Sequence, residues 1–391
     1  MAKLIDITGK ALSGEWGNDD ENGNGIPVLR KTNFTNIGVV NYSNIITRDI
    51  RKSNLSEKYL RKGDIIIEKS GGSDTQPVGR VIYFEGEEHK YLFNNFTGLL
   101  RVKDSTVCFP KYLFYSLFYN YQRGGTIPFQ NKTTGLHNLK TDDYVKSCDI
   151  PLPPLETQRR IAANLDKVTN LIDTCNSILE KLDLLVKSRF VEMFADYRDE
   201  VILGQIAEIT GGITKNSKRV NLPLKLPYLR VANVFFAKID LTEVLEIGLT
   251  EDERDKTLLK DNDLLFVEGN GSPDQIGRVA IWKNEISPCV HQNHLIKARI
   301  REKSVLPIFV MHYFMTQQGR DQIKAKAVST SGLYTLSISK ISGLTIPLPP
   351  IDLQNQFAAF VEETDKSKYR AQNIRNKITE VFSRVKLRLF G

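Results

Sequence analysis

The stretch IPLPPLETQRRIAANLDKV occupies residues 150–168, and a close copy, IPLPPIDLQNQFAAFVEET, occupies residues 346–364. After each proline pair comes a long charged segment without Pro or Gly. Proline fixes φ, cannot donate to a sheet ladder and pushes the preceding residue toward an extended conformation. We therefore expect PLPP to end the last strand of a globular head. Pro154 and Pro350 should occupy the first turn of a long helix, where a missing N–H costs nothing.

The similarity between the two halves of the chain extends far beyond this joint. PVLRKTNFTNIGVV from Pro27 resembles PYLRVANVFFAKID from Pro227, and LRKGDIIIEKSGGSDTQPVGRVIYF from Leu60 resembles LKDNDLLFVEGNGSPDQIGRVAIW from Leu259. NNF at 94–96 corresponds to QNH at 292–294, and TGL at 134–136 to SGL at 331–333. Because these landmarks keep their order, we interpret the chain as two copies of a unit of roughly 195 residues.

Each unit is predicted to contain an α+β head followed by a helical segment. DIIIEKS, VGRVIYF and TGLLRV are β-branched or aromatic runs that predict strands, and 110–125 and 306–320 predict helices. The expected domains are a first head at 1–154, a first helical region at 155–198, a second head at 199–350 and a second helical region at 351–391. The expected fold class is therefore α+β, with two repeated heads separated by two long helices.

Apolar residues in the helical segments alternate at spacings of four and three, which is typical of paired helices. We expect helices over 155–194 and 351–389 to pair antiparallel, although two helices packed separately on their own heads would also fit. Polar residues at Thr364, Lys368 and Arg375 interrupt the second apolar seam, so the helices are also expected to face partner helices. The residues expected to pair or to bind a partner are Ile161, Leu165, Val168, Ile172, Leu179, Leu182, Phe357, Val361, Ile378 and Val385.

The composition favours a globular protein of the cytoplasm. Hydrophobic residues make up 41% of the 391 residues and charged residues 26%, with a net charge of +8. The four cysteines lack the spacing of a metal or redox motif. The most apolar run, at 112–121, is too short to span a bilayer, and the start of the chain lacks the apolar core of a signal peptide. The positive charge is compatible with a polyanionic partner.

Catalytic and metal-binding interpretations are weak. Asp20, Asn22 and Asn24 have the spacing of a calcium loop, but Lys31 occupies the position that needs a bidentate Glu. His291 and His294 lie three residues apart, yet the first copy has Phe at both places. A nuclease could use Asp74 with the Glu-x-Lys at 88–90, which the second copy lacks. The chain has no nucleotide-binding or nucleophile motif. We therefore predict no catalytic residue and no metal site.

The joints PLPPLETQ and PLPPIDLQ, within a duplicated chain of heads and helices, resemble the specificity subunit of type I restriction-modification systems. The Gly-rich segments KSGGSDTQPVGRV and VEGNGSPDQIGRVA, and LGQIAEITGGITK at 203–215, also resemble that family. The resemblance covers the whole chain. The family's joint usually reads Pro-Leu-Pro-Pro-Leu-x-Glu-Gln; this chain keeps Gln158 and Gln354 but has Thr157 and Leu353 in place of Glu.

The resemblance implies a non-catalytic protein that reads double-stranded DNA. The heads would be target recognition domains, each reading one half of a bipartite target, which is a sequence of two specific halves separated by a gap. The helices would hold two adenine methyltransferase subunits and set the gap, and restriction/translocase subunits would complete the complex. S-adenosylmethionine, ATP and magnesium would belong to those partners, so this chain itself would need no cofactor. The alternatives are another DNA-binding scaffold with a partner-recruiting rod, or a stand-alone nuclease.

DNA contact requires polar side chains near base edges and cations near phosphates. The loops at 128–139 and 324–336 combine amides, hydroxyls and cations, and they are the best candidates for base contact. Because these loops differ, the two half-sites should differ. Arg80 and Arg278 recur at equivalent positions and are expected to be structural or to contact phosphates. The full set of candidates is Lys31, Asn33, Lys69, Ser70, Ser73, Arg80, Asn94, Asn95, Gln130, Asn131, Lys132, Thr133 and Thr134 in the first head, and Lys215, Lys218, Arg219, Arg230, Asn233, Asn270, Ser272, Arg278, Gln292, Asn293, Lys326, Ser329, Thr330, Ser331 and Tyr334 in the second.

Overall fold

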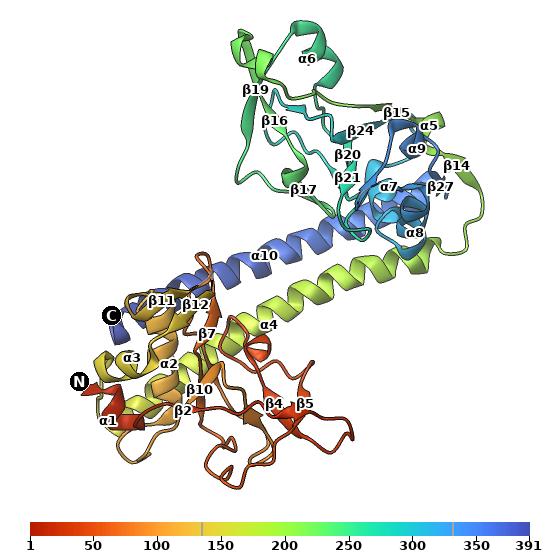
Figure 1. Cartoon of the computed structure of the whole chain (residues 1–391). Coiled ribbons are helices and arrows are strands. Elements are labelled where there is room, and N and C mark those ends of the chain that lie inside the picture. Colours follow the sequence, from red (N-terminus) through yellow and green to blue (C-terminus); the bar gives the residue numbers. More distant parts are fainter. Residues whose placement is uncertain (134–135, 331) are drawn as a thin grey trace. The chain divides into compact units, whose positions relative to one another are not determined.

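The structure is a computed structural model that describes residues 1–133, 136–330 and 332–391 (Figure 1). The chain divides into two compact units. The first unit comprises Met1–Thr174 and Ile374–Gly391, and the second comprises Cys175–Asn373. Each unit thus contains one head, part of the first long helix and part of the second.

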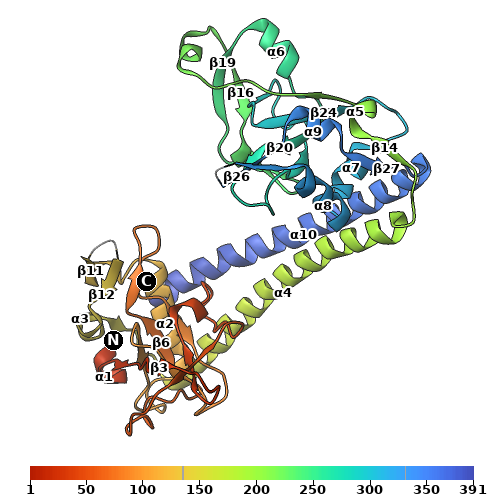
Figure 2. The same ribbon diagram turned by 45° about the vertical axis from the view of Figure 1, so that its right-hand side comes forward.

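The two long helices are α4 (Leu155–Phe194) and α10 (Ile351–Phe390), with 40 residues each. Each begins directly after its proline pair, and each is about 60 Å long at 1.5 Å per residue. In the first unit the start of α4 packs with the end of α10, and in the second unit the end of α4 packs with the start of α10 (Figure 2). The helices are therefore antiparallel, as predicted, and the α+β fold class with two paired long helices is confirmed. Within the described residues, neither these helices nor any other is apolar enough over a sufficient length to cross a membrane.

The two heads share most of their elements. The helices and strands of the first head are β1 (Ala2–Lys3), α1 (Leu4–Thr8), β2 (Leu12–Ser13), β3 (Asn18–Asp19), β4 (Ile26–Leu29), β5 (Ile46–Asp49), β6 (Ile65–Glu68), β7 (Ser70–Gly72), β8 (Val81–Tyr83), β9 (Leu92–Phe93), β10 (Thr97–Leu100), α2 (Pro110–Gln122), β11 (Gln130–Thr133), β12 (Leu136–Leu139), α3 (Thr141–Ser147) and β13 (Asp149–Ile150). Those of the second are β14 (Glu200–Ile202), α5 (Leu203–Ile206), β15 (Ala207–Thr210), β16 (Leu224–Leu229), β17 (Val234–Phe235), β18 (Lys238–Ile239), β19 (Leu245–Leu249), α6 (Glu251–Thr257), β20 (Leu264–Val267), β21 (Gly269–Asn270), β22 (Val279–Ile281), β23 (Val290–His291), β24 (Leu295–Ile300), α7 (Pro307–Tyr313), α8 (Gln317–Lys326), β25 (Val328–Thr330), β26 (Leu333–Thr335), α9 (Ile338–Ser342) and β27 (Thr345–Pro347). Within the described residues, α6, β17 and β18 of the second head and β3 of the first have no counterpart.

The sheets repeat in the same order. The central sheet is β2-β10-β6-β8 in the first head and β15-β24-β20-β22 in the second, with all neighbours antiparallel. The strand that ends in the proline signature pairs with the first strand of its head, as β1-β13 and β14-β27. The central strands β6, β8, β20 and β22 consist mainly of β-branched and other apolar residues and are largely buried, which suits a pleated surface in the core. The repeat in the sequence is therefore a repeat of whole sheets.

The main apolar core of each unit lies where the head meets the long helices. In the first unit, Leu113 and Leu117 of α2 share a buried cluster with Leu165 of α4 and Phe390 of α10. In the second unit, the ring of Phe357 on α10 lies 5.2 Å from that of Phe190 on α4 and 5.2 Å from the imidazole of His312 on α7. Burial of this much apolar surface stabilises the joint between head and helix.

A buried glutamine fixes each joint. Gln158 accepts the backbone N–H of Phe109 at 2.8 Å and donates to the carbonyls of Val107 and Pro153. Gln354 repeats this arrangement with the N–H of Leu306 and the carbonyls of Ser304 and Pro349. Both side chains are fully buried, at 0% exposure. The amide therefore ties the first turn of each long helix to the start of the helix that covers the sheet.

The predicted helix at 306–320 is wrong in one respect, because the structure contains two helices, α7 and α8. Thr316 caps the second helix, its hydroxyl accepting the N–H of Gly319 at 3.2 Å. A side chain at Gly319 would collide with the backbone carbonyl of Tyr313, so glycine permits the chain to turn closely here.

The apolar seam also shifts at the end of α10. Val385 is 38% exposed, whereas the neighbouring Lys386 is buried. The Lys386 ammonium donates to Gln122 Oε1 at 2.7 Å and lies 4.4 Å from the ring centroid of Phe382. A strict seven-residue repeat drifts around a straight helix, so the inward-facing position moves to the adjacent residue.

Candidate nucleic-acid interface

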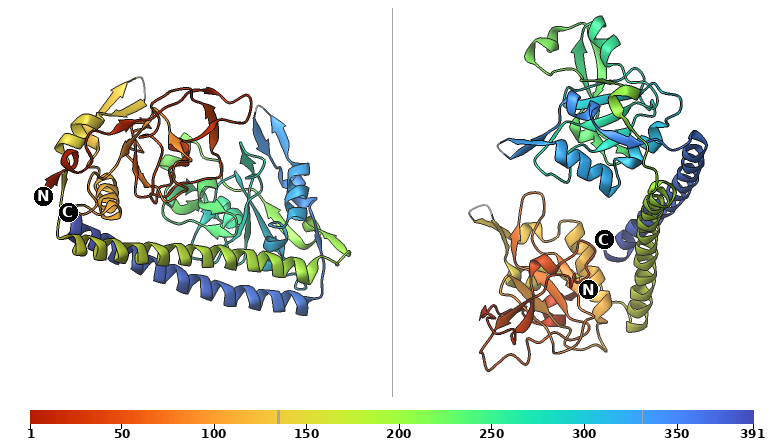
Figure 3. Two further views of the ribbon diagram at one scale, coloured as in Figure 1. Left: turned by 90° about the horizontal axis from the view of Figure 1, so that it is seen from below. Right: turned by 90° about the vertical axis from the view of Figure 1, so that its right-hand side faces the viewer.

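A small three-stranded sheet brings the predicted loops together with the Gly-rich strand of each head. In the first head the hairpin β11-β12 pairs with β7, so that Asn138 lies opposite both Asn131 and Ser70. In the second head the hairpin β25-β26 pairs with β21, so that Tyr334 lies opposite both Ser329 and Asn270. Figure 3 shows both hairpins extending from their own heads. The sequence thus predicted segments that the fold assembles into one surface per head.

The side chains of the first hairpin differ in their freedom to bind a ligand. Gln130 donates to the carbonyl of Val78 at 3.1 Å and bonds with His137 Nδ1 at 3.2 Å, so its amide supports the hairpin. Asn131 is exposed. Thr134 lies outside the described residues, as do the side chains of Lys132 and Thr133.

In the second hairpin, Ser329 is exposed and Tyr334 is half-buried against the core of the second unit. Ser331 lies outside the described residues, as does the side chain of Thr330. Lys326, at the end of α8, is half-buried. An exposed hydroxyl beside a half-buried aromatic ring gives this hairpin a chemistry different from that of the first.

Two of the predicted asparagines are buried and serve the fold. Asn33 Oδ1 accepts the N–H of Arg30 at 2.9 Å, and its amide donates to the carbonyl of Asn41. Asn233 makes the equivalent bonds with Arg230 and Asp240. The recurrence of this turn in both heads indicates a structural role, because buried amides must satisfy their hydrogen bonds.

Asn94 is likewise buried, and its Oδ1 accepts from the Thr97 hydroxyl at 3.2 Å. The other predicted polar residues lie at or near the surface, some with local hydrogen bonds. Ser73 bonds with Thr75, Asn270 accepts the N–H of Ser272, and Lys69 donates to Ser13 at 3.0 Å. The residues in this class are Lys31, Lys69, Ser70, Ser73, Asn95, Lys215, Lys218, Asn270, Ser272, Gln292 and Asn293.

Three of the predicted arginines are held in ion pairs. Arg80 bonds with Glu68, Arg219 with Glu253, and Arg230 with Glu243. The hydrogen bonds from Arg219 are the main cause that lowers the pKa of Glu253 to about 2. Because the carboxylate offsets the charge of the guanidinium, these arginines attract a phosphate less strongly than free cations do.

The structure separates the groups that a metal or nuclease site would need. His291 is buried, with its Nδ1 bonded to the carbonyl of Leu295, and burial lowers its pKa to about 3. His294 instead bonds with Glu268 on the surface. Asp74 pairs with His137. Among the residues that the structure describes, no three His, Cys, Asp or Glu side chains gather as metal ligands.

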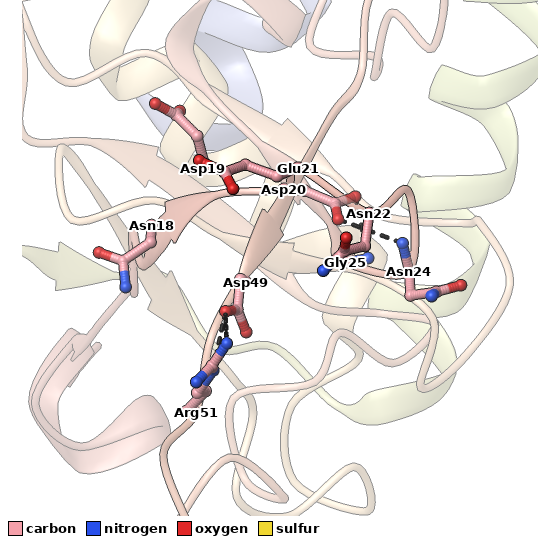
Figure 4. A pocket seen from close by; sticks show the side chains of 9 residues that line it. All are labelled: Asn18, Asp19, Asp20, Glu21, Asn22, Asn24, Gly25, Asp49 and Arg51. Carbon is pink, nitrogen blue, oxygen red and sulfur yellow. Dashed lines mark hydrogen bonds and ion pairs between the residues drawn. The ribbon is translucent and has the colours of Figure 1, made fainter.

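In the acidic loop that resembles a calcium site, the carboxylate of Asp20 is hydrogen-bonded by the backbone of the same loop. Asp20 accepts the backbone N–H groups of Asn24 at 3.1 Å and Gly25 at 2.9 Å (Figure 4). The hydrogen bond with Thr47, followed by that with Gly25, lowers the pKa of Asp20. This pattern is that of a self-closed surface turn.

Comparison with known proteins agrees with this architecture. The model of the family "Type I restriction modification DNA specificity domain" matches residues 2–184 and again residues 198–380. The EcoKI specificity subunit of Escherichia coli (strain K12) is 24% identical over 369 residues, covering 86% of this chain and 75% of that protein. The StySPI specificity subunit of Salmonella potsdam is 23% identical with the same two coverages.

The fold is also that of a solved structure. The S subunit of a type I restriction-modification system from M. genitalium aligns with a TM-score of 0.56 and 15% identity, covering 100% of this chain and 95% of that one. The family model matches almost the entire chain, once for each head with its helical segment. The chain therefore belongs to the type I restriction-modification DNA specificity family, as a non-catalytic specificity subunit with two copies of the domain.

Proposed function

We propose that each head reads one half of a bipartite double-stranded DNA target, with residues 1–154 and 199–350 acting as the two target recognition domains. The observation that carries this proposal is the small hairpin sheet. It occupies the same place in both heads, yet it presents Asn131 in one and Ser329 with Tyr334 in the other. A common scaffold with different exposed side chains is what reading two different half-sites requires.

We further propose that the helical regions at 155–198 and 351–391 recruit two methyltransferase subunits. Large apolar side chains lie exposed along both helices, and an exposed apolar surface of this kind is typical of a protein interface. They are Leu171, Ile374, Val381, Val385 and Leu387 in the first unit and Ile178, Leu184, Leu185, Val191 and Tyr369 in the second. The restriction/translocase subunits would complete the cytoplasmic complex, and S-adenosylmethionine, ATP and magnesium would be bound by the partner subunits.

Recruitment is tested at exposed positions of each unit. Leu184 is 63% exposed and Leu387 is 60% exposed, so aspartate there should leave the fold intact. Leu184→Asp and Leu387→Asp should each reduce co-purification of the methyltransferase, because the interface would bury an unpaired charge. Ser53→Asp, at an exposed position of the first head between β5 and β6 and off both helices, is the control and should leave co-purification unchanged. Unchanged co-purification in both leucine variants would contradict recruitment by these helices.

DNA reading is tested by mapping methylated adenines in a host that expresses the chain with its methyltransferase. We expect one bipartite motif, which disappears when the chain is deleted. A continuous motif, or methylation that persists without the chain, would contradict the proposal.

The gap between the half-sites can be tested in the same host. At roughly 3.4 Å per base pair, a helix of about 60 Å corresponds to roughly 18 base pairs. Removing seven residues from both α4 and α10 should therefore change the gap and preserve the two half-sites. Altered half-sites with an unchanged gap would contradict a role of the helices in spacing.

A further inference from the structure

The repeated arginines Arg80 and Arg278 occupy the same position of the backbone. In the first head, the N–H of Glu68 donates to the carbonyl of Arg80 at 2.8 Å. In the second head, the N–H of Val267 donates to the carbonyl of Arg278 at 2.9 Å. The residue opposite the arginine is therefore a glutamate in one head and a valine in the other.

Arg80 is neutralised by this glutamate. Its Nε lies 3.0 Å from Glu68 Oε2 and its Nη2 lies 3.2 Å from Oε1. Glu68 is only 2% exposed, so the carboxylate is held inside the head and cannot move away from its partner. A two-point pair of this kind is both strong and geometrically specific.

Arg278 lacks such a partner. Its Nη1 reaches Gln275 Oε1 at 3.3 Å and its Nη2 reaches the carbonyl of Val231 at 3.4 Å, both long bonds to neutral groups. Its Nε is buried without a hydrogen bond. Within the described parts of the chain, no carboxylate forms an ion pair with this guanidinium, which lies over the ring of Phe235 at 5.3 Å. Burial lowers its pKa, as expected for a cation without an anion.

The first head carries a different cation, Lys31, at the matching place. The carbonyl that Arg80 contacts belongs to Lys31, and the carbonyl that Arg278 contacts belongs to Val231, so these two residues correspond. The Lys31 ammonium lies against Gly71 of β7, so close that a side-chain carbon on this glycine would collide with it. Within the described residues, neither Lys31 beside Arg80 in the first head nor Arg278 in the second forms an ion pair with a carboxylate.

We propose that Lys31 and Arg278 bind backbone phosphates of the DNA, one in each head, whereas Arg80 is structural. The proposal deepens the proposed function and rests on it. A phosphate is the favoured ligand because the cation recurs in two heads whose hairpins differ, and a phosphate contact carries no sequence information.

The test uses the assembled complex of the full chain with its methyltransferase subunits. Binding to target DNA is measured against salt concentration for Lys31→Gln, Arg278→Gln and the wild type. Each substitution should weaken binding and reduce the slope of log K against log salt by about 0.9, the value of one phosphate contact. The loss should be the same on DNA in which either half-site is scrambled. Lys303→Gln, which removes an exposed charge from the loop before α7, is the control and should leave the slope unchanged.

A second variant tests whether the missing carboxylate opposite Arg278 is what leaves this cation able to bind a phosphate. Val267→Glu places a carboxylate where the first head has Glu68, and it should flatten the salt dependence as much as Arg278→Gln while the arginine stays in place. If Val267→Glu does not fold, as judged by a thermal melt, Lys31→Gln and Arg278→Gln decide the question alone.

The outcomes separate the two proposals. A wild-type complex that binds its bipartite target, together with an unchanged slope in Arg278→Gln, overturns the phosphate assignment and leaves the proposed function standing. An unchanged slope with altered preference at one base pair overturns it in favour of a base contact. A wild-type complex without preference for a bipartite target overturns the proposed function itself.

Discussion

In the first head a buried glutamate neutralises Arg80, and in the second head Val267 occupies the place of that glutamate beside Arg278. The joints show the opposite behaviour, because Gln158 and Gln354 repeat the same three hydrogen bonds in both units. The joint residues are thus identical in the two copies, whereas the carboxylate opposite the repeated arginine is present in only one of them. Comparing the units therefore shows where one head has a cation without the neutralising partner of the other, and such a position is a candidate for recognition.

The largest difference in stability between the units should appear when the repeated arginine of each head is replaced by leucine. Arg80→Leu leaves Glu68 buried without its partner, which should cost about 3–5 kcal/mol of stability. Arg278→Leu removes an unpaired cation and should be nearly neutral. The two tryptophans report separately, since Trp16 lies in the first unit and Trp282 in the second. Equal losses in denaturant melts followed by the two fluorophores would contradict the distinction.

The joint glutamines should behave alike in both units. Gln158→Leu and Gln354→Leu each leave a buried N–H and two carbonyls without their amide partner, so each should lower the stability of its unit by about 1–3 kcal/mol. Single-tryptophan variants would assign each loss to the correct unit. A loss at one joint and none at the other would show that the joints are not equivalent.

The joints also show which features of the fold could be predicted from the sequence alone. The repeat, the strands, the long helices and their antiparallel pairing follow from proline, periodicity and spacing, which are local signals. The retained glutamines were visible in the sequence, but their three bonds depend on the loops before α2 and α7, which come from elsewhere in the chain. Lys386 was missed because its burial requires Gln122 and Phe382 to be in place.

The candidate interface was predictable as segments and less so as individual residues. The hairpins at β11-β12 and β25-β26 could be located from their amides and hydroxyls, yet Gln130, Asn33 and Asn233 use their amides within the heads. Glu68 was not a candidate, although alignment of the two copies places Val267 opposite it. The missing signal was the pairing between neighbouring strands, which only the fold supplies.

Acid should lower the stability of the second unit more than that of the first, because the second head has His291 where the first has Phe93. Burial lowers the pKa of His291 to about 3 in the folded state. Its neutral form is therefore favoured by folding at neutral pH, and this stability is lost as pH falls from about 6.5 toward 3. His312, whose pKa is lowered to about 4, adds in the same direction.

At pH 5 the loss from His291 alone should be about 2 kcal/mol. His291→Phe should make the acid sensitivity of the Trp282 transition smaller and leave the Trp16 transition unchanged. The same acid dependence in this variant as in the wild type would contradict the role of His291.

The smallest expected effects concern base preference, and they test whether each head acts alone. Asn131→Ala removes one exposed amide from the first hairpin and should relax preference within the first half-site by about 1 kcal/mol, the lower end for a single base contact. Ser329→Ala should do the same only within the second half-site. Competition binding with DNA altered in one half at a time measures both. Since each variant serves as the control for the other, loss of preference at both half-sites from either substitution would mean that the heads do not read independently.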